Sequence, residues 1–135
     1  MRPIKFRAWH KENKEMWTAE DLIDNEYNLY ADGRIEYHLL SYENNKCIKT
    51  DDFILMQFTG LHDKNGKEIF EGDILSWEAG SDEYDRGHVY YYRGGFFISF
   101  EKTPHHSTSE PVADELENYK IEVLGNIYEN PELLK

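Results

Sequence analysis

The stretch from Phe58 to Leu75, FTGLHDKNGKEIFEGDIL, has the residue types of a metal-binding loop, because acids, an amide and three glycines fall within eighteen residues. A calcium-binding EF-hand loop needs oxygen ligands at alternate positions, a glycine at the sixth position and a bidentate glutamate at the twelfth. Counted from Asp63, the glycine comes at the fourth position, as Gly66, and the twelfth is Ile74. This spacing excludes an EF-hand.

The same stretch fits a tight turn better than a metal loop. Asn65-Gly66 supplies the positive φ angles that such a turn requires, and the Asp63 carboxylate is placed to accept hydrogen bonds from backbone N–H groups. Gly72 lets the backbone enter the next strand at an angle that only glycine accepts. Asp73 is expected to bond to the backbone of the preceding turn. The stretch is therefore predicted to fold the chain and not to perform chemistry.

The adjacent pair His105-His106 is the most metal-like constellation elsewhere in the chain. Neighbouring side chains on an extended chain point to opposite sides, so joint ligation by this pair is awkward and a solvated loop is preferred. Ser107, Thr108 and Ser109 follow, but no G-x-S-x-G elbow accompanies them. A P-loop, a Rossmann fingerprint and an H-E-x-x-H motif are also absent from the sequence. We therefore predict no catalytic, metal-binding or cofactor-binding residue, and no cofactor.

The charge balance restricts the class of partner. The 15 Lys and Arg residues stand against 27 Asp and Glu, which gives a formal net charge of -12. General nucleic-acid binding depends on neutralising phosphates, so we expect no direct binding to DNA or RNA. Anionic membrane surfaces are disfavoured for the same reason. An acidic chain can instead bind a basic partner or imitate a nucleic acid, although a plain solvated surface also explains the charge.

Cysteine usage and hydropathy indicate the compartment. Cys47 is the only cysteine, which excludes an intramolecular disulfide and any C-x-x-C motif. The N-terminal sequence MRPIKFRAWHKENK has no apolar run like that of a signal peptide. No stretch approaches the roughly 18 apolar residues of a membrane span. We therefore expect a cytoplasmic protein.

Alternation of apolar and polar residues with a period of two predicts strands along most of the chain. The predicted hairpins and strands cover residues 3–18, 26–40, 53–58, 72–77, 88–100 and 120–128. Short helical turns are predicted after Thr18, over residues 111–119 and at the C-terminus. The polar segment 41–52 is predicted to be the main internal loop.

The order of these elements predicts a mainly β protein with minor helix. From residue 49 to residue 135, a strand, a long folded-back loop, a strand, a hairpin and a last strand fit an SH3-like five-stranded barrel. Residues 1–48 are predicted to form β-hairpins that pack on this barrel as part of the same fold.

Three blocks carry further information: IKFRAW at 4–9, the stretch 58–75 and EVLGNIYENPELL at 122–134. In this order and spacing they resemble the YopX family of phage and prophage proteins. The resemblance implies a small β-rich protein encoded by a bacteriophage or prophage, located in the cytoplasm of a bacterial host, and without an established activity. Relatives usually have an acid after FRAW, where this chain has His10, so that position is assigned no role. The turn residues of these blocks, predicted to be structural, are Gly60, Asp63, Asn65, Gly66, Gly72, Asp73, Gly125, Asn126, Asn130 and Pro131.

Aromatic residues are the remaining candidates for function. In HVYYYR, Val89 and Tyr91 share one face of a strand, which is interpreted as core, while Tyr90 and Tyr92 share the other face. An exposed aromatic face beside the acidic loop 82–85 suits a protein-binding surface, although coverage by the N-terminal hairpins is the alternative. The predicted buried or interfacial aromatics are Trp9, Trp77, Tyr90 and Tyr92.

Three functional hypotheses follow. The leading one is a non-enzymatic accessory protein, a protein-interaction module with an unidentified, basic, host-encoded partner and a capacity to form homo-oligomers. The second is an inhibitor of host nucleic-acid-binding proteins that presents carboxylates as a phosphate mimic, which requires acids in a regular stripe about 7 Å apart along a strand. The third is a hydrolase or nuclease that uses His105 or His106 with acids.

Overall fold

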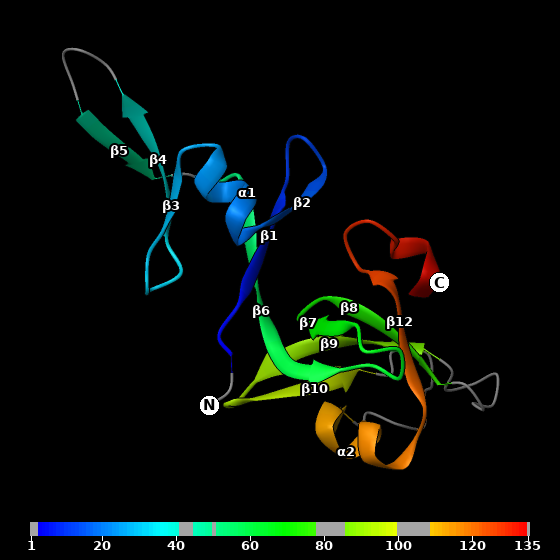
Figure 1. Ribbon diagram of the computed structural model, residues 1–135. Coiled ribbons are helices and arrows are strands. Elements are labelled where there is room, and N and C mark those ends of the chain that lie inside the picture. The colour runs from blue at the N-terminus through cyan, green and yellow to red at the C-terminus, as the bar shows by residue number, and fades with distance from the viewer. Residues whose placement is uncertain (1–2, 41–44, 50, 78–85, 100–108, 135) are drawn as a thin grey trace. The chain divides into compact units, whose positions relative to one another are not determined.

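The structure is a computed structural model that describes residues 3–40, 45–49, 51–77, 86–99 and 109–134. The described residues form twelve strands, two short α-helices and one 3-10 helix, which confirms the predicted mainly β fold (Figure 1). The chain divides into two compact units, an N-terminal unit of residues 5–56 and a C-terminal unit of residues 57–135 with residues 1–4. The predicted division after residue 48 stays a prediction.

The N-terminal unit begins with the β-hairpin predicted for residues 3–18. Its strands β1 (Phe6–His10) and β2 (Glu15–Thr18) pair antiparallel, and helix α1 (Ala19–Asp24) follows directly. The Thr18 hydroxyl accepts a hydrogen bond from the Asp21 N–H at 3.1 Å, and the Asp21 carboxylate accepts one from the Thr18 N–H at 2.8 Å. This reciprocal capping box stabilises the start of a helix of only six residues, as predicted for Thr18.

A second hairpin joins β3 (Tyr27–Leu29) to β4 (Ile35–Leu40), and Gly33 in its turn has a φ of +87°. Strand β5 (Asn45–Lys49) pairs with β4 and completes a three-stranded sheet of order β3-β4-β5. The prediction of a loop over residues 41–52 is therefore wrong for residues 45–49. Polarity of the side chains indicates exposure, whereas this segment becomes a strand because its backbone groups pair with the edge of β4.

The core of the N-terminal unit is small and aromatic. Ala8, Leu22 and Ile35 are buried at its centre. The partly buried side chains that pack against them are Trp17, Tyr27, Leu29, Phe53 and Leu55. The Phe53 ring contacts His10 and Tyr27 edge-on, with centroid distances of 4.8 and 5.0 Å, and such edge contacts are a favoured aromatic geometry.

Strand β6 (Phe53–His62) contains the apolar run predicted as a strand and continues from the N-terminal unit into the C-terminal unit. It lies next to β7 (Glu68–Phe70) in a sheet of order β2-β1-β6-β7. The pairing of β6 with β7 changes register between Phe58 and His62, and Gly60 has a φ of +84° within this bulge. A residue without a side chain suits the bulge because the left-handed region is costly for other residues.

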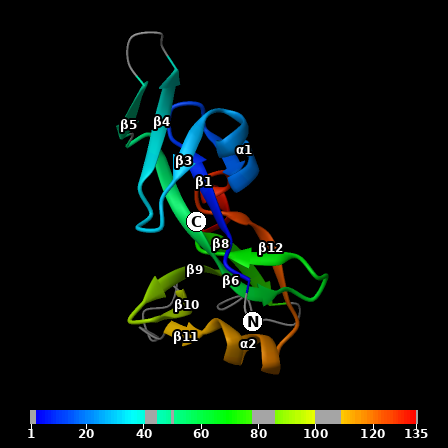
Figure 2. The same cartoon turned by 60° about the vertical axis from the view of Figure 1, so that its left-hand side comes forward.

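The C-terminal unit is built on a five-stranded antiparallel sheet of order β11-β10-β9-β8-β12. Its strands are β8 (Asp73–Trp77), β9 (Arg86–Tyr92), β10 (Gly95–Ser99), β11 (Ser109–Pro111) and β12 (Ile121–Asn126). Helix α2 (Val112–Asn118) lies beside β10 and β11, and the 3-10 helix η1 (Pro131–Leu134) follows β12 (Figure 2). A five-stranded sheet and both helical segments are present as predicted, but β6 lies in the other sheet and β11 supplies the fifth strand. The SH3-like barrel stays a prediction.

One face of this sheet forms the core of the C-terminal unit. The buried residues of the cluster are Ile69, Leu75, Trp77, Val89, Ile98, Val112 and Ile121. The Trp77 indole N–H donates to Glu115 Oε2 at 3.1 Å and thereby links the sheet to α2. Val89 is in the core as predicted, but Tyr91 is 52% exposed because it lies at the end of β9, next to the hairpin turn.

The turn around Asp63 joins two segments that are distant in the sequence. The Asp63 carboxylate accepts hydrogen bonds from the Asn65 and Lys67 N–H groups at 2.8 and 2.9 Å within its own turn. Its second oxygen accepts from the Val123 N–H of β12 at 2.9 Å. Gly66 has a φ of +83° and its N–H donates to the Asp63 carbonyl, which closes the turn.

Burial by itself raises the pKa of Asp63, but the N–H donors of Val123, Lys67 and Asn65 lower it by more, so the pKa lies below its usual value. Both oxygens of this carboxylate therefore accept hydrogen bonds from the backbone.

Gly72 and Asp73 hold the start of β8. Gly72, at a φ of +84°, donates its N–H to the Val89 carbonyl and accepts from the Ile127 N–H, both at 2.8 Å. The buried Asp73 carboxylate accepts from the Phe70 N–H at 2.8 Å, so it bonds to the preceding turn. These bonds tie β8 to segments on both sides of it.

The end of β12 has a second compact turn. The Asn126 side chain accepts from the Tyr128 and Glu129 N–H groups at 3.0 and 2.9 Å. The Asn130 side chain lies over Gly125, where a Cβ atom would come within 2.3 Å of its Oδ1. Pro131 is the first residue of η1, a position where the missing N–H costs nothing.

Asp63→Asn should destabilise the protein by about 2 kcal/mol or more near neutral pH, because the amide group cannot accept all three N–H groups. The folded pKa of Asp63 lies below its unfolded value. Its stabilisation is therefore complete above about pH 4 and is lost as the pH falls through the folded pKa. Urea unfolding followed by tryptophan fluorescence should thus show a large difference from the wild type near neutral pH and a small one in acid. An equal difference at both pH values would contradict this account.

Gly125→Ala should destabilise the protein by about 1–3 kcal/mol, because the new methyl group displaces the Asn130 side chain. Adding Asn130→Gly to this variant removes the obstruction, so the double variant should be more stable than the sum of the two single effects predicts. Thermal unfolding of all three variants measures this coupling, and strictly additive losses would rule out the steric explanation.

Candidate protein-interaction surface

The β9–β10 hairpin gathers aromatic side chains on one surface. Successive residues of a strand point to opposite faces, so His88, Tyr90 and Tyr92 of β9 share one face. Phe97 of β10 is directly opposite Tyr90 in the antiparallel register. Ring centroids are 6.1 Å apart for Tyr90 and Phe97 and 6.5 Å apart for Tyr90 and Tyr92. We call the surface formed by His88, Tyr90, Tyr92 and Phe97 the aromatic face.

The aromatic face is fixed from behind by the core. Val89 and Ile98 are opposite one another in the register and point the other way, where both are buried. Along the edge, the Tyr90 hydroxyl hydrogen-bonds to the Ser109 hydroxyl of β11. The hairpin therefore holds the aromatic face on a rigid support, which reduces the entropy lost when a partner binds.

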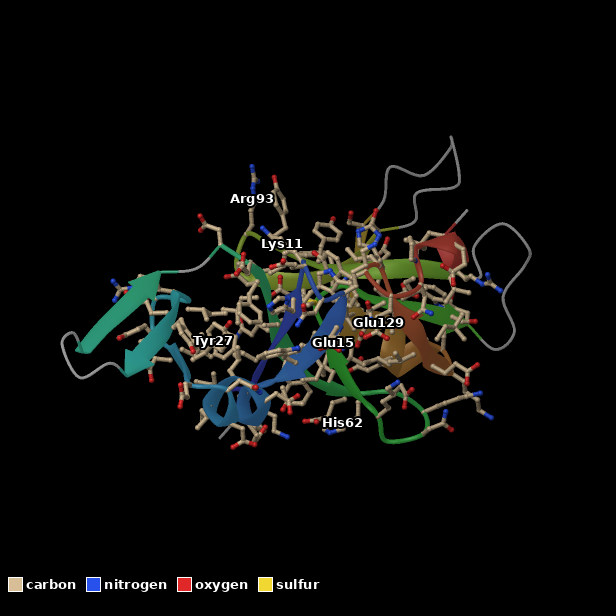
Figure 3. All side chains as sticks on the ribbon, turned by 90° about the horizontal axis from the view of Figure 1, so that it is seen from above. Lys11, Glu15, Tyr27, His62, Arg93 and Glu129 are labelled. Atoms are coloured by element: carbon tan, nitrogen blue, oxygen red, sulfur yellow. The ribbon has the colours of Figure 1, made fainter. Side chains whose placement is uncertain are left out.

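The hairpin turn adds a cation to the aromatic face. Arg93 and Gly94 have φ angles of +46° and +83°, and two consecutive positive φ angles are typical of a type I′ turn. The Arg93 guanidinium lies over the Tyr92 ring, 5.2 Å from its centroid. Figure 3 shows the Arg93 side chain pointing away from the strands at the end of the hairpin.

A positive φ is costly for arginine. Asn or Gly would occupy this turn position with less strain, since the left-handed conformation costs a residue with a Cβ about 1 kcal/mol. Arg93 is exposed in the hairpin turn, and packing in the described part of the chain does not require an arginine there. Lys14 and Glu26 also have positive φ angles, so Arg93 is distinguished from them by its place over the exposed ring of Tyr92.

Exposure separates the four aromatic residues predicted for burial or an interface. Tyr90 is half-buried and Tyr92 is 51% exposed, both on the aromatic face. Trp77 is buried in the core of the C-terminal unit, and Trp9 is buried in β1 of the N-terminal unit. The structure therefore brings Tyr90 and Tyr92 together and gives the two tryptophans separate, buried places.

The sequence pattern placed Tyr91 in the core, and it did not single out Arg93 or Phe97. Tyr91 lies on the other side of the hairpin with its ring 5.4 Å from that of Phe96, and it is as exposed as Tyr92. A hairpin turn directly after a run of tyrosines could have identified all three residues as candidates for exposure. Side chains beside a turn are covered less by neighbouring strands than those in the middle of a sheet.

Several predicted features lie outside the described residues, namely the acidic loop 82–85 and the segment with His105, His106, Ser107 and Thr108. Within the described ranges, no three His, Cys, Asp or Glu side chains are grouped closely enough to hold a metal ion. No helix among the described residues has the length and apolar character needed to span a membrane.

Comparisons with known proteins give a consistent result. The family model described as YopX protein matches residues 5–135. The structure is similar to that of protein EF1440 from Enterococcus faecalis, with 29% identity, complete coverage of both chains and a TM-score of 0.62. It is also similar to the structure of protein yopX from Bacillus subtilis, with 21% identity, coverage of 100% of this chain and 98% of that one, and a TM-score of 0.59. No curated protein gives a significant match.

Substitutions should separate the surface aromatics from the core ones. Tyr91→Thr and Tyr92→Thr should each change the free energy of unfolding by less than about 1 kcal/mol, because both rings are half exposed and threonine favours strands. Trp77→Ala should cost about 3–5 kcal/mol because it removes a buried ring from the core. Chemical denaturation measures all three. A loss above 3 kcal/mol for Tyr92→Thr would show that the ring supports the fold rather than a contact surface.

Proposed function

This chain belongs to the YopX family, and from that starting point we propose that it is a non-enzymatic protein-interaction module that contacts its partner with the β9–β10 hairpin. We further propose that it is an accessory protein of phage or prophage origin acting in the bacterial cytoplasm. The observation that carries the proposal is the hairpin end, where Tyr92 is half exposed with the Arg93 guanidinium over its ring, and Tyr91 is equally exposed on the opposite face.

The composition of the hairpin end supports a protein partner. Tyrosine and arginine are enriched at the energetic centres of protein interfaces. Tyrosine buries a large area with few rotatable bonds, and arginine offers many hydrogen-bond donors. The tyrosines at positions 91 and 92 also belong to a small set, since only six large hydrophobic side chains of the described residues are well exposed. Two of these six are consecutive in β9, and one of them, Tyr92, contacts Arg93.

The net charge supports a basic partner. A formal charge of -12 on 135 residues attracts positively charged proteins and repels acidic ones over several ångströms in solution. Acids also lie in α2, where Asp114 and Glu117 are exposed. The hairpin would supply the buried contacts and the acidic surface would supply the long-range attraction.

The phosphate-mimic alternative is less well supported. It requires acids at alternate positions of a strand, and no strand in the described part of the chain carries two acids in this pattern. The hydrolase alternative depends on His105 and His106, which lie outside the described ranges. The interaction module is therefore the function that the described residues support best.

Four versions of the protein test the proposal: the wild type, Tyr92→Thr, Arg93→Gly and the control Tyr119→Thr. Tyr119 is 57% exposed and lies after α2, so the control loses the same side chain at equal exposure elsewhere. Each version is immobilised and exposed to a bacterial lysate, and the mass of each in solution is measured by light scattering. We expect one basic protein to bind the wild type and Tyr119→Thr and to be released by salt.

Arg93→Gly gives the sharpest outcome. Glycine accepts a φ of +46° without strain. The free energy of unfolding of this variant should therefore differ from that of the wild type by less than about 1 kcal/mol. Its affinity for the partner should nevertheless fall at least about tenfold, as expected for an arginine at an interface centre. If all four versions bound the partner equally, the hairpin would not be the contact site. A stable homo-oligomer that Tyr92→Thr dissociates would identify a second copy of the chain as the partner.

A further inference from the structure

The N-terminal unit contains a cleft of about 580 Å³ that the proposed interaction surface does not include. It lies between the turn of the β3–β4 hairpin, the residue that follows β1 and the start of β6. The residues that line it are Lys11, Asp32, Gly33, Arg34, Ile35, Asp51, Phe53 and Leu55. A volume of this size lies within the range of small-molecule sites.

The cleft has an apolar floor and a charged rim. Ile35, Phe53 and Leu55 provide the floor, and all three belong to the packed core of this unit. Gly33 allows the hairpin turn to approach the floor closely, since a Cβ there would lie 3.4 Å from Leu55 Cδ2. Four of the eight lining residues are charged, which makes the cleft more polar than most small-molecule sites, so a matching ligand carries charges of its own.

Two of the four charges on the rim already have partners within the protein. The Arg34 guanidinium lies 3.5 Å from an Asp32 oxygen and 3.4 Å from a Glu36 oxygen, and it also stacks over the Tyr30 ring. Asp32 in addition accepts the Arg34 N–H at 3.0 Å. Arg34 and Asp32 are thus held by each other and fix the shape of the turn.

Lys11 and Asp51 differ from that pair. Both are exposed on the rim, and no ion pair joins either side chain to the other or to any other residue in the described ranges. The backbone holds them near one another, because the Lys11 N–H donates to the carbonyl of Asp52 at 2.8 Å. One cation and one anion on the rim of the same cleft match a ligand that carries both charges.

We infer that this cleft binds a free α-amino acid with an apolar side chain. The ligand carboxylate is placed at Lys11, the ligand ammonium group at Asp51, and the apolar side chain on Ile35, Phe53 and Leu55. An anion alone or a cation alone would leave one of the two rim charges without a partner. This inference does not depend on the proposed function, since it concerns other residues in the other unit.

Leucine and its two blocked forms test the inference as probes. Leucine carries both charges, N-acetyl-leucine carries only the carboxylate, and leucinamide carries only the ammonium group. Titrations are followed by the methyl NMR signals of Ile35 and Leu55, because both side chains line this cleft. We expect leucine to bind up to about fivefold more tightly than either blocked form, as expected for one added exposed ion pair.

Charge-removing variants assign each end of the ligand. Lys11→Gln should weaken leucine and N-acetyl-leucine but leave leucinamide unchanged, and Asp51→Asn should weaken leucine and leucinamide but leave N-acetyl-leucine unchanged. Lys14→Gln and Asp24→Asn are matched controls, because both residues are exposed in the same unit and neither lines the cleft. The controls should bind all three probes like the wild type.

Three results would overturn the inference. Absence of saturable shifts with leucine at millimolar concentration would show that the cleft does not bind amino acids. Equal affinity for leucine and both blocked forms would show that only the apolar floor is recognised. Equal effects of Lys11→Gln and Lys14→Gln would show that overall charge, and not the rim of the cleft, governs the binding.

Discussion

The Asp63 carboxylate is the interaction on which the C-terminal unit most depends. It accepts three backbone N–H groups, two from its own turn and one from β12, sixty residues further along the chain. A charged acceptor makes stronger hydrogen bonds than a neutral one, and each donor would be costly to leave unpaired in a buried site. The turn before β7 and the last strand of the sheet are therefore fixed by the same side chain.

The same kind of bond recurs at the other polar turn residues of the C-terminal unit. Its polar side chains already face backbone donors: Asp63 serves its own turn and β12, Asp73 serves Phe70, and Asn126 serves the turn after β12. The glycines allow backbone segments to approach or to adopt left-handed angles, as at Gly72 and Gly125. A network satisfied in this way rigidifies the fold.

Two groups of exposed residues are not explained by this framework: the end of the β9–β10 hairpin and part of the rim of the N-terminal cleft. Val89 and Ile98 of the β9–β10 hairpin are buried in the core, while its end exposes two tyrosines and an arginine with a positive φ. In the N-terminal unit, Arg34 and Asp32 neutralise each other, while Lys11 and Asp51 on the same cleft do not. In both places the residues that stand out are those whose properties the packing of the described chain does not explain.

The sequence by itself determined the local elements of this protein. Period-two alternation predicted the hairpins, Thr18 predicted the helix cap, and Asn65-Gly66 and Gly72 predicted the turns, because each of these depends on residues that are close in the chain. The family was also identified from three sequence blocks, and the family model confirms it. Only the tertiary structure decided the long-range partners: the pairing of β5 with β4, the bond from Val123 to Asp63, and the exposure of Tyr91. These depend on which backbone edge or side chain is near in space, and alternation along the chain does not contain that information.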